Sequence, residues 1–293
     1  MQHEGSRLKI AVASGKGGTG KTTVATSLAL ALINETPLLF LDCDVEAPNA
    51  HLFLKPALDQ RADAVVLIPE VDEQRCRQRG VCGQVCQYHA IALVGQRVQV
   101  FPELCHGCGS CALNCPEQAI REIPHVVGTV ESGRTAEGIR FARGVLRIGQ
   151  PMAVPVIRQL RRANPVRAGE IAILDAPPGT SCPVVATIRE VDYVLLVTEP
   201  TPFGLHDLRL AYELTRELDV PAGVVINRDG VGEGGVDAFC TQVGLPVLLR
   251  VPMDRGIAAG FAQGIPLVQL RPEYKARFRQ LFAAMVSQAG AYA

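Results

Sequence analysis

A glycine-rich run near the start of the chain, Ser14 to Thr23, limits the possible folds more than any other segment. It reads SGKGGTGKTT, follows an apolar stretch and precedes a helical pattern. From Gly15 to Thr22 it fits the spacing GxxxxGK[ST], in which glycines allow backbone N–H groups to converge on phosphate oxygens at a helix N-terminus. A strand, a loop, a lysine, a hydroxyl and a helix in this order predict a nucleotide-binding α/β fold, and a chance glycine-rich turn is the competing interpretation.

Short apolar stretches alternate with helical patterns along the rest of the chain. This alternation predicts a mostly parallel sheet covered by helices on both faces. The last helical pattern has apolar residues on one face, which we expect to pack on the sheet of its own domain, with a membrane tether as the alternative. The expected strands are 8–13, 38–41, 171–174, 193–198, 222–226 and 247–251, and the expected helices are 21–33, 204–218 and 272–288.

The lysine after the first glycine, Lys16, gives the loop the form KGGTGKT. This form resembles the deviant Walker A loop of the P-loop ATPase family that includes MinD, ParA, Mrp and the nitrogenase iron protein, in which two subunits face each other across their nucleotides. The resemblance implies ATP or ADP and Mg²⁺ as ligands, and a homodimer, or a heterodimer with a paralogue, on ATP binding. Lys21 would then reach the β and γ phosphates, Thr22 would hold Mg²⁺, and Lys16 would cross to the partner's phosphates. A solvated loop lysine is the simpler alternative for Lys16. The implied nucleotide-binding residues of the loop are Gly15, Lys16, Gly17, Gly18, Thr19, Gly20, Lys21, Thr22 and Thr23.

Three further apolar segments end in polar residues at the places of the family's other nucleotide motifs. By resemblance, Asp44 orients or activates the attacking water and Asp42 supports the site, although such a pair can also cap a helix. Asp175 would hold Mg²⁺ through water, and Gly179 would sense the γ-phosphate. Asn227 would contact adenine, unless it is an ordinary turn residue at the end of a strand.

A segment of different composition, from Arg61 to Glu122, separates these motifs and holds seven of the ten cysteines. It contains an internal repeat with a spacing of 29 residues, which pairs Cys76 with Cys105, Cys82 with Cys111, and Cys86 with Cys115. Duplication at this spacing resembles a two-cluster bacterial ferredoxin, and the second half fits the pattern CxxCxxCxxxCP. We therefore expect a P-loop ATPase domain of residues 1–60 and 123–293, interrupted by a small α+β ferredoxin-like domain of residues 61–122.

In the ferredoxin pattern, the fourth cysteine of each run ligates the other cluster. This crossed assignment gives one complete set for a 4Fe–4S cluster, namely Cys86, Cys105, Cys108 and Cys111. The other set, Cys76, Cys82 and Cys115, is incomplete, because Arg79 stands where a cysteine is expected and cannot ligate iron. That second site then holds a 3Fe–4S cluster, or a 4Fe–4S cluster whose fourth iron is bound by water, His89 or an outside ligand, or no cluster.

Other uses of the cysteines match the sequence less well. Structural zinc sites use CxxC pairs, but they do not call for a triplet, a distant fourth cysteine and a repeat. Disulfides do not suit a chain that has no apolar signal after Met1, so we expect a cytoplasmic protein. The 29 basic and 29 acidic residues balance, which argues against nucleic acid binding, and no apolar run approaches the roughly 20 residues of a membrane-spanning helix.

Together the motifs predict a Mg²⁺-dependent ATPase whose nucleotide-driven dimer gates its ferredoxin module. The module would assemble or transfer an iron–sulfur or mixed-metal cluster for a client protein, or deliver electrons to a redox partner, and the gap at Arg79 favours assembly. Two features depart from the family: only Cys240 stands near the place of the Mrp-type CxxC pair, and Cys182 lacks the partner needed for a bridging cluster of the nitrogenase type. The alternatives are a positioning ATPase of the MinD and ParA kind with a redox-sensing insert, and a ferredoxin with a vestigial nucleotide site.

Overall fold

The computed structural model describes residues 7–232 and 235–290 of the chain. Residues 1–6, where the sequence shows no apolar signal, lie outside these ranges. The chain divides into two compact units. We call residues 1–61, 130–145 and 157–293 the sheet unit, and residues 62–129 and 146–156 the cysteine-rich unit.

Each of the six expected strands and three expected helices is present and differs from the observed element only at its ends, and the structure adds strands and helices that were not predicted. The strands of the large sheet are β1 (Leu8–Ala13), β2 (Leu38–Asp42), β3 (Ala57–Val71), β6 (Ile120–Arg134), β7 (Arg140–Leu146), β8 (Ile171–Asp175), β9 (Tyr193–Thr198), β10 (Ala222–Asp229) and β11 (Val247–Pro252). The helices are α1 (Lys21–Leu32), α2 (Ala50–Leu54), α5 (Val154–Ala163), α6 (Cys182–Ile188), α7 (Pro202–Glu217), α8 (Val236–Val243), α9 (Arg255–Ala262), α10 (Leu267–Leu270) and α11 (Tyr274–Ala289).

The nine strands form one sheet in the order β11-β10-β9-β1-β8-β2-β7-β6-β3. Pairing is parallel at every step from β11 to β7. On β8, Asp175 is level with Val12 of β1 and with Asp42 of β2. Because the carboxyl ends of parallel strands meet at one edge, the loops after β1, β2 and β8 gather at the same edge of the sheet.

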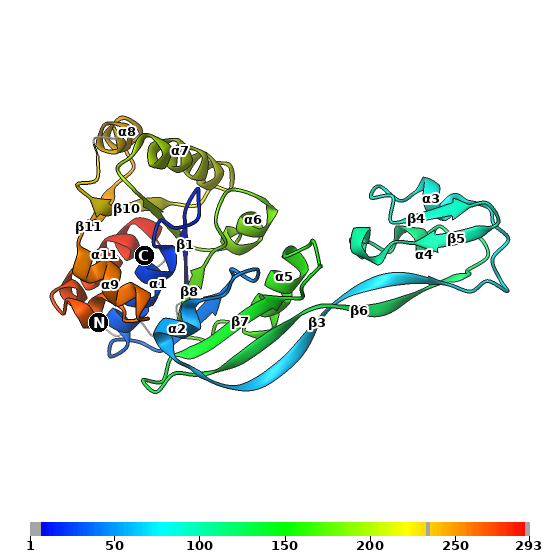
Figure 1. Cartoon of the computed structure of the whole chain (residues 1–293), viewed down its shortest axis with the longest axis horizontal. Helices are drawn as coiled ribbons and strands as arrows, with labels where there is room; N and C mark the ends of the chain where they lie inside the picture. Colours follow the sequence, from blue (N-terminus) through cyan, green and yellow to red (C-terminus); the bar gives the residue numbers. More distant parts are fainter. Residues whose placement is uncertain (1–6, 233–234, 291–293) are drawn as a thin grey trace. The chain divides into compact units, whose positions relative to one another are not determined.

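Both faces of the central strands are buried, which explains why their sequences are almost continuously apolar. On one face, Ile10, Phe40 and Ile173 pack with α1 and α11 in the main hydrophobic core. The alternate residues Ala11 and Leu174 are equally buried, and α6 and α7 contact β1 and β9 (Figure 1). The expected class, a mostly parallel sheet flanked by helices, is confirmed.

The C-terminal helix α11 belongs to this core. Tyr274, Phe278, Leu281 and Met285 are all buried along its length. The helix packs against α1, and the Tyr193 hydroxyl on β9 donates a 2.6 Å hydrogen bond to the side-chain oxygen of Gln288. The expectation that this helix packs on its own domain is confirmed.

Strand β7 is not predicted by the sequence pattern, because charged residues interrupt its apolar stretch. Arg140 pairs with Glu170 at 2.7 Å, and Arg143 pairs with Glu131 at 2.7 Å. All four side chains are largely buried. A buried charge is tolerated when it is paired and hydrogen-bonded, so these distant partners allow a strand where the local sequence does not predict one.

The cysteine-rich unit repeats its backbone conformation at the 29-residue spacing of the sequence repeat. Its own elements are α3 (Val81–Gln84), β4 (Ile91–Val94), β5 (Arg97–Val100), the 3₁₀ turn η1 (Pro102–Leu104) and α4 (Ser110–Leu113), with β4 antiparallel to β5. Helices α3 and α4 follow Gly80 and Gly109, whose φ angles are 73° and 72°. Later in each half, His89 and Gln118 have φ angles of 52° and 48°. The duplication therefore holds in three dimensions as well as in sequence.

Candidate functional site

The phosphate loop connects the end of β1 to the first residue of α1. Gly18 and Gly20 have φ angles of 81° and 92°, in the region that favours glycine. A Cβ atom on Gly15 would lie 2.2 Å from the backbone oxygen of Asp207. The local conformation therefore requires glycine at these positions and brings the loop backbone to the positive end of α1.

A cavity of about 400 Å³ opens beside this loop. Part of its wall is apolar, from Phe53, Ile257 and Phe261, which suits a flat base. The loop's N–H groups and the ammonium of Lys21 provide the positive charge that phosphates need. The predicted site residues among those that line the cavity are Gly17, Gly18, Gly20, Lys21, Thr22, Thr23, Asp44 and Asn227.

Thr22, which lines this cavity, lies in direct contact with Asp175. The Thr22 hydroxyl donates a 2.6 Å hydrogen bond to Asp175 Oδ2. The other oxygen, Oδ1, is buried and has no hydrogen-bond partner among the described residues. Burial raises the pKa of Asp175 to about 7. A buried carboxylate oxygen without a partner next to a hydroxyl is a chemically suitable pair of ligands for Mg²⁺.

Asp42 and Asp44 lie at the end of β2 but in different surroundings. Asp42 is fully buried, and its carboxylate accepts hydrogen bonds from the backbone N–H groups of Asp44 at 3.3 Å and of Ala50 at 3.0 Å. Burial and the neighbouring Asp175 raise its pKa well above the usual range. Asp44 lines the cavity and is less buried, and burial raises its pKa while Lys21 opposes the shift. Asp44 is thus the acid that can contact a ligand in the cavity, and Asp42 stabilises the loop after β2 through its hydrogen bonds to the backbone.

The signature lysine, Lys16, is held by an ion pair that the sequence analysis missed. Its ammonium lies 3.6 Å from the carboxylate of Glu199, which also binds Arg228 at 2.7 Å. Arg228 donates a further hydrogen bond of 3.2 Å to the backbone oxygen of Gly18. Glu199 follows β9, and Arg228 follows Asn227 at the same edge of the sheet. Their positions at strand ends were the feature of the sequence that could have assigned them to the site.

Two other predicted residues, Asn227 and Gly179, support the loop through hydrogen bonds. The Asn227 amide donates to the backbone oxygen of Thr19 at 2.7 Å, and Asn227 also lines the cavity. The N–H of Gly179 donates to the backbone oxygen of Ser14 at 3.0 Å. Thr19 is buried, and its hydroxyl has no partner among the described residues. The loop is therefore braced from β8 and β10 as well as from its own helix.

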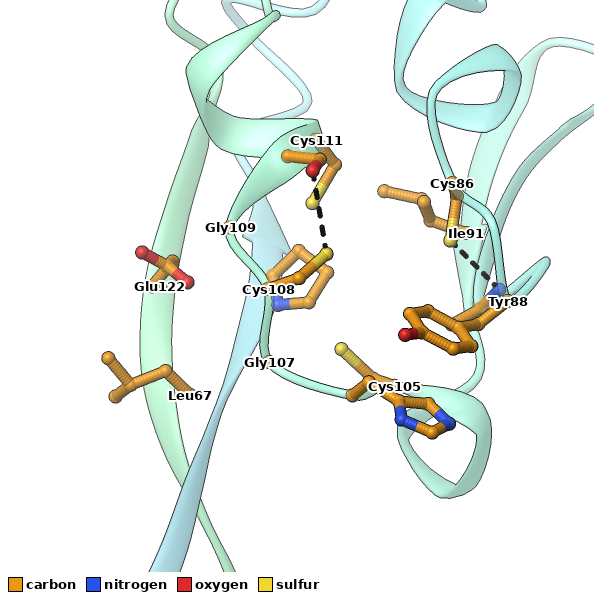
Figure 2. Close-up of a pocket in the computed structure, with 14 residues that line it drawn as sticks. Leu67, Cys86, Tyr88, Ile91, Cys105, Gly107, Cys108, Gly109, Cys111 and Glu122 are labelled. Atoms are coloured by element: carbon orange, nitrogen blue, oxygen red, sulfur yellow. Dashed lines mark hydrogen bonds between the residues drawn. The ribbon is translucent and has the colours of Figure 1, made fainter. Parts of the chain in front are cut away.

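In the cysteine-rich unit, seven cysteines lie around two separate pockets. We call the first the four-thiol pocket, because it is lined by Cys86, Cys105, Cys108 and Cys111. Figure 2 shows these side chains directed toward a common space, with Cys86 on one side and the loop of the other three opposite. The second, the three-thiol pocket, is lined by Cys76, Cys82 and Cys115 together with Arg79. Each pocket combines cysteines from both halves of the repeat.

Backbone and side-chain donors surround these sulfur atoms. Cys86 and Cys115 each accept a 3.3 Å hydrogen bond from the N–H group four residues later, on Ala90 and Ala119. Hydrogen bonding between Cys108 and the backbone and hydroxyl of Ser110 lowers the pKa of Cys108, whereas burial raises the pKa of Cys111 to about 11. No three His, Cys, Asp or Glu side chains in the described parts of the chain converge on a single ion. In a cubane, by contrast, each ligand binds its own iron.

Comparison with known proteins places the fold among nucleotide-binding domains. Residues 10–267 match the family described as the CobQ/CobB/MinD/ParA nucleotide binding domain. The uncharacterized protein MJ0578 of Methanocaldococcus jannaschii is 34% identical over 79% of this chain and 82% of its own length. An iron–sulfur cluster carrier protein of Synechocystis sp. is 26% identical over 90% of this chain and 65% of its own length.

The structural comparison agrees with the sequence match. The septum site-determining protein MinD of Pyrococcus horikoshii, solved in complex with Mg-ADP, has a TM-score of 0.60 and covers 98% of this chain and 99% of its own. Its sequence identity is 20%, so this similarity bears on the fold alone. Within the described residues, no helix has both the length and the apolarity to cross a membrane.

Proposed function

We propose, from the premise that this chain belongs to the CobQ/CobB/MinD/ParA family of nucleotide-binding domains and is a P-loop ATPase, that ATP controls iron–sulfur clusters held in its cysteine-rich unit. The nucleotide chemistry would take place in the cavity beside the phosphate loop. The clusters would lie in the four-thiol and three-thiol pockets. Thiolate clusters need a reducing compartment such as the cytoplasm.

The sheet unit carries the groups that phosphoryl transfer requires. Lys21 and the loop N–H groups would neutralise charge on the phosphates, and Asp44 would orient the attacking water. Thr22 and Asp175 would hold Mg²⁺, because Asp175 Oδ1 is buried with no partner among the described residues. The bound ion supplies charge neutralisation and aligns the phosphates. Asn227 would contact the adenine.

Lys16 would complete the site of a partner subunit. Its side chain is 35% exposed, and its ion pair with Glu199 is long at 3.6 Å. Glu199 keeps its 2.7 Å ion pair with Arg228 when Lys16 leaves, so Lys16 can exchange Glu199 for a phosphate at small cost. The catalytic assembly would therefore be a dimer formed on ATP binding, either of this chain or with a paralogue.

Residues 61–122 would form a ferredoxin-like domain with two cluster sites. Cys86, Cys105, Cys108 and Cys111 provide one thiolate for each iron of a 4Fe–4S cluster, and their convergence on one pocket supports this assignment. Cys76, Cys82 and Cys115 provide three thiolates for a 3Fe–4S cluster or for a 4Fe–4S cluster with one differently ligated iron. The hydrogen bonds to Cys86 and Cys115 would tune the potentials of the two clusters.

A short stretch of chain connects the nucleotide cavity to the cysteine-rich unit. Asp42 binds the N–H of Ala50, the first residue of α2, and β3 begins at Ala57 soon after this helix ends. A change at Asp44 on nucleotide binding therefore has a continuous covalent and hydrogen-bonded route through α2 to β3. In nucleotide-dependent switches, such segments commonly become ordered when the γ-phosphate is present and disordered when it is lost.

The observation that supports the proposal is that one chain has an intact P-loop together with one complete and one incomplete set of cysteines. An iron without a cysteine ligand is suited to exchange, which favours cluster assembly or transfer to a client protein over simple electron delivery. The Synechocystis relative, an iron–sulfur cluster carrier protein, is consistent with this choice at 26% identity.

The test compares the anaerobically purified protein with its Lys21→Ala variant. Iron, sulfide and electron paramagnetic resonance spectra are measured without nucleotide, with Mg-ADP and with Mg-ATP, and iron transfer to a chelator is timed in each state. We expect Mg-ATP to change the spectrum or the transfer rate in the wild type only. Identical spectra and rates in all nucleotide states would refute the coupling.

A further inference from the structure

The two cluster pockets are related by the repeat, but the relationship fails at two positions that touch each other. Arg79 stands where the repeat places Cys108, and Glu117 stands where it places Tyr88. The Arg79 Nε lies 3.3 Å from Glu117 Oε1. Both residues line the three-thiol pocket, as Cys108 and Tyr88 line the four-thiol pocket. The side chains at these repeat positions thus face a pocket in both halves.

The turn that carries Glu117 fixes its position relative to the cysteines. The N–H of Gln118 donates to the backbone oxygen of Cys115 at 3.1 Å, and the N–H of Ala119 donates to the Cys115 sulfur at 3.3 Å. Pro116 further restricts the backbone between the sulfur and the carboxylate. The glutamate is therefore held beside Cys115 by the same turn that orients this thiol.

Glu117 is the only carboxylate among the described residues that line the three-thiol pocket. Apart from the three cysteines, the remaining lining side chains are apolar, glycine, the amide of Gln78, or the cations Arg77 and Arg79. The lining set in the described structure does not include His89, which the sequence suggested as a ligand. Of the side chains present, Glu117 is the anionic oxygen donor available to iron.

Stability alone does not account for the Arg79–Glu117 pair. The side chains are 65% and 29% exposed, and ion pairs with such exposure contribute little to the free energy of unfolding. The exposures also show that Arg79 is on the solvent side and Glu117 is the more buried partner. The guanidinium thus sits on the outside of a carboxylate that lines the pocket.

We infer that Glu117 is the fourth ligand of a 4Fe–4S cluster in the three-thiol pocket, and that Arg79 is a positioning residue for its carboxylate. The inference rests on the proposed function, since it assumes that Cys76, Cys82 and Cys115 hold iron. A carboxylate is a harder ligand than a thiolate and competes less well with added thiols. The iron bound by Glu117 is therefore the exchangeable one.

The experiment uses full-length protein reconstituted with iron and sulfide under anaerobic conditions. We expect equal amounts of iron and sulfide in the wild type, and a loss of iron relative to sulfide in Glu117→Gln. Departure of Fe²⁺ leaves a reduced 3Fe–4S cluster, so in this variant the 3Fe–4S resonance signal should appear after one-electron oxidation with added ferricyanide. The matched control is Glu122→Gln, which removes a carboxylate beside the complete four-thiol pocket and should change neither quantity. The double variant Arg79→Cys/Glu117→Gln should regain equal iron and sulfide, because the new cysteine takes the position equivalent to Cys108.

The outcomes separate this inference from the proposed function. If the Cys82→Ala variant binds as much iron as the wild type, the pocket holds no cluster and the proposed function loses its second site. If the wild type has two complete clusters and Glu117→Gln keeps both, only the ligand assignment is wrong. A 3Fe–4S signal already present in the reconstituted wild type would equally refute Glu117 as a ligand. Failure of the double variant to recover would assign Glu117 a structural role instead.

Discussion

Thr22 and Asp175 share a 2.6 Å hydrogen bond that joins the first turn of α1 to the end of β8. The bond occupies only one oxygen of the carboxylate, and the second oxygen is buried with no partner within residues 7–232 and 235–290. An unpaired buried carboxylate oxygen costs free energy, because it has lost its water without replacing it. Binding of a cation would give this oxygen a partner and so remove the free-energy cost of burying it.

Replacing Asp175 with asparagine should therefore impair hydrolysis more than nucleotide binding. The amide keeps the hydrogen bond to Thr22 but lacks the negative charge that holds Mg²⁺. We expect the Mg²⁺-dependent rate of Asp175→Asn to fall by ~100-fold or more, in line with the several kcal/mol that a metal ion contributes. The measurements are phosphate release and the affinity for ATP without Mg²⁺. A rate within a few-fold of the wild type would contradict the assignment.

The same residue should make the stability of the metal-free chain depend on pH. Burial raises the pKa of Asp175 to about 7 from the ordinary value of 3.8. Between these values the folded state binds more protons than the unfolded state, so the free energy of unfolding falls as pH rises through this window and levels off above it.

Thermal unfolding in the presence of a chelator checks this pH dependence. At pH 8, Asp175→Asn should unfold at a temperature higher than the wild type by roughly 5 °C or more, because the penalty for burying the charge is gone. The advantage should shrink when the pH is lowered to about 5. The exposed Asp219→Asn is the control and should show no such trend. An advantage independent of pH would point to a cause other than ionisation.

Lys16 should control association of two chains. With Asp44→Ala, hydrolysis is blocked, and we expect ATP to produce a particle of twice the 31.4 kDa chain mass in light scattering. Adding Lys16→Ala should weaken this dimer by at least ~10-fold, because a charged contact to the partner's phosphates is lost. Lys275→Ala on α11 is a matched control. A particle that stays monomeric with ATP in Asp44→Ala would contradict the proposed dimer.

Cys86 should affect the cluster of the other half of the repeat. Since it lines the four-thiol pocket, Cys86→Ser should alter the resonance signal that Cys108→Ser alters and leave the second cluster intact. Cys115→Ser should instead match Cys82→Ser. Spectra of the four variants, recorded before and after reduction, give the comparison. If Cys86→Ser resembles Cys82→Ser, the ligands are grouped within each half and the crossed assignment is wrong.

The central strands were predictable because their information is local. The stretches ending at Ala13 and Asp42 are almost continuously apolar, and residues that line the nucleotide cavity follow them closely, from Gly17 and at Asp44, so one pattern marks both the strand and the site. Strand β7 was not predictable in this way, because Arg140 is acceptable only with Glu170, which lies 30 residues away. Burial of a charge depends on such a partner, and a local window does not contain it.

The limits at the candidate site have a similar origin. The motifs identified Lys16 but not Glu199 and Arg228, which bind it and its loop from β9 and β10. These contacts follow from the strand order, in which β9 lies beside β1 and β10 lies on the other side of β9. In the cysteine-rich unit the change of composition at Glu122 falls inside β6, which continues to Arg134. Composition marks where chemistry changes, whereas a strand ends where its hydrogen bonds end.

The small core of the cysteine-rich unit has a consequence for the life of the protein in the cell. Its buried members are Cys82, Ile91 and Cys111, so thiols that would bind iron also provide much of its interior. A core this small does not stabilise a fold alone, and binding of the proposed clusters would supply part of the folding free energy. Newly made chains in iron-starved cells would expose this unit to proteases, so iron supply would set how much intact protein accumulates.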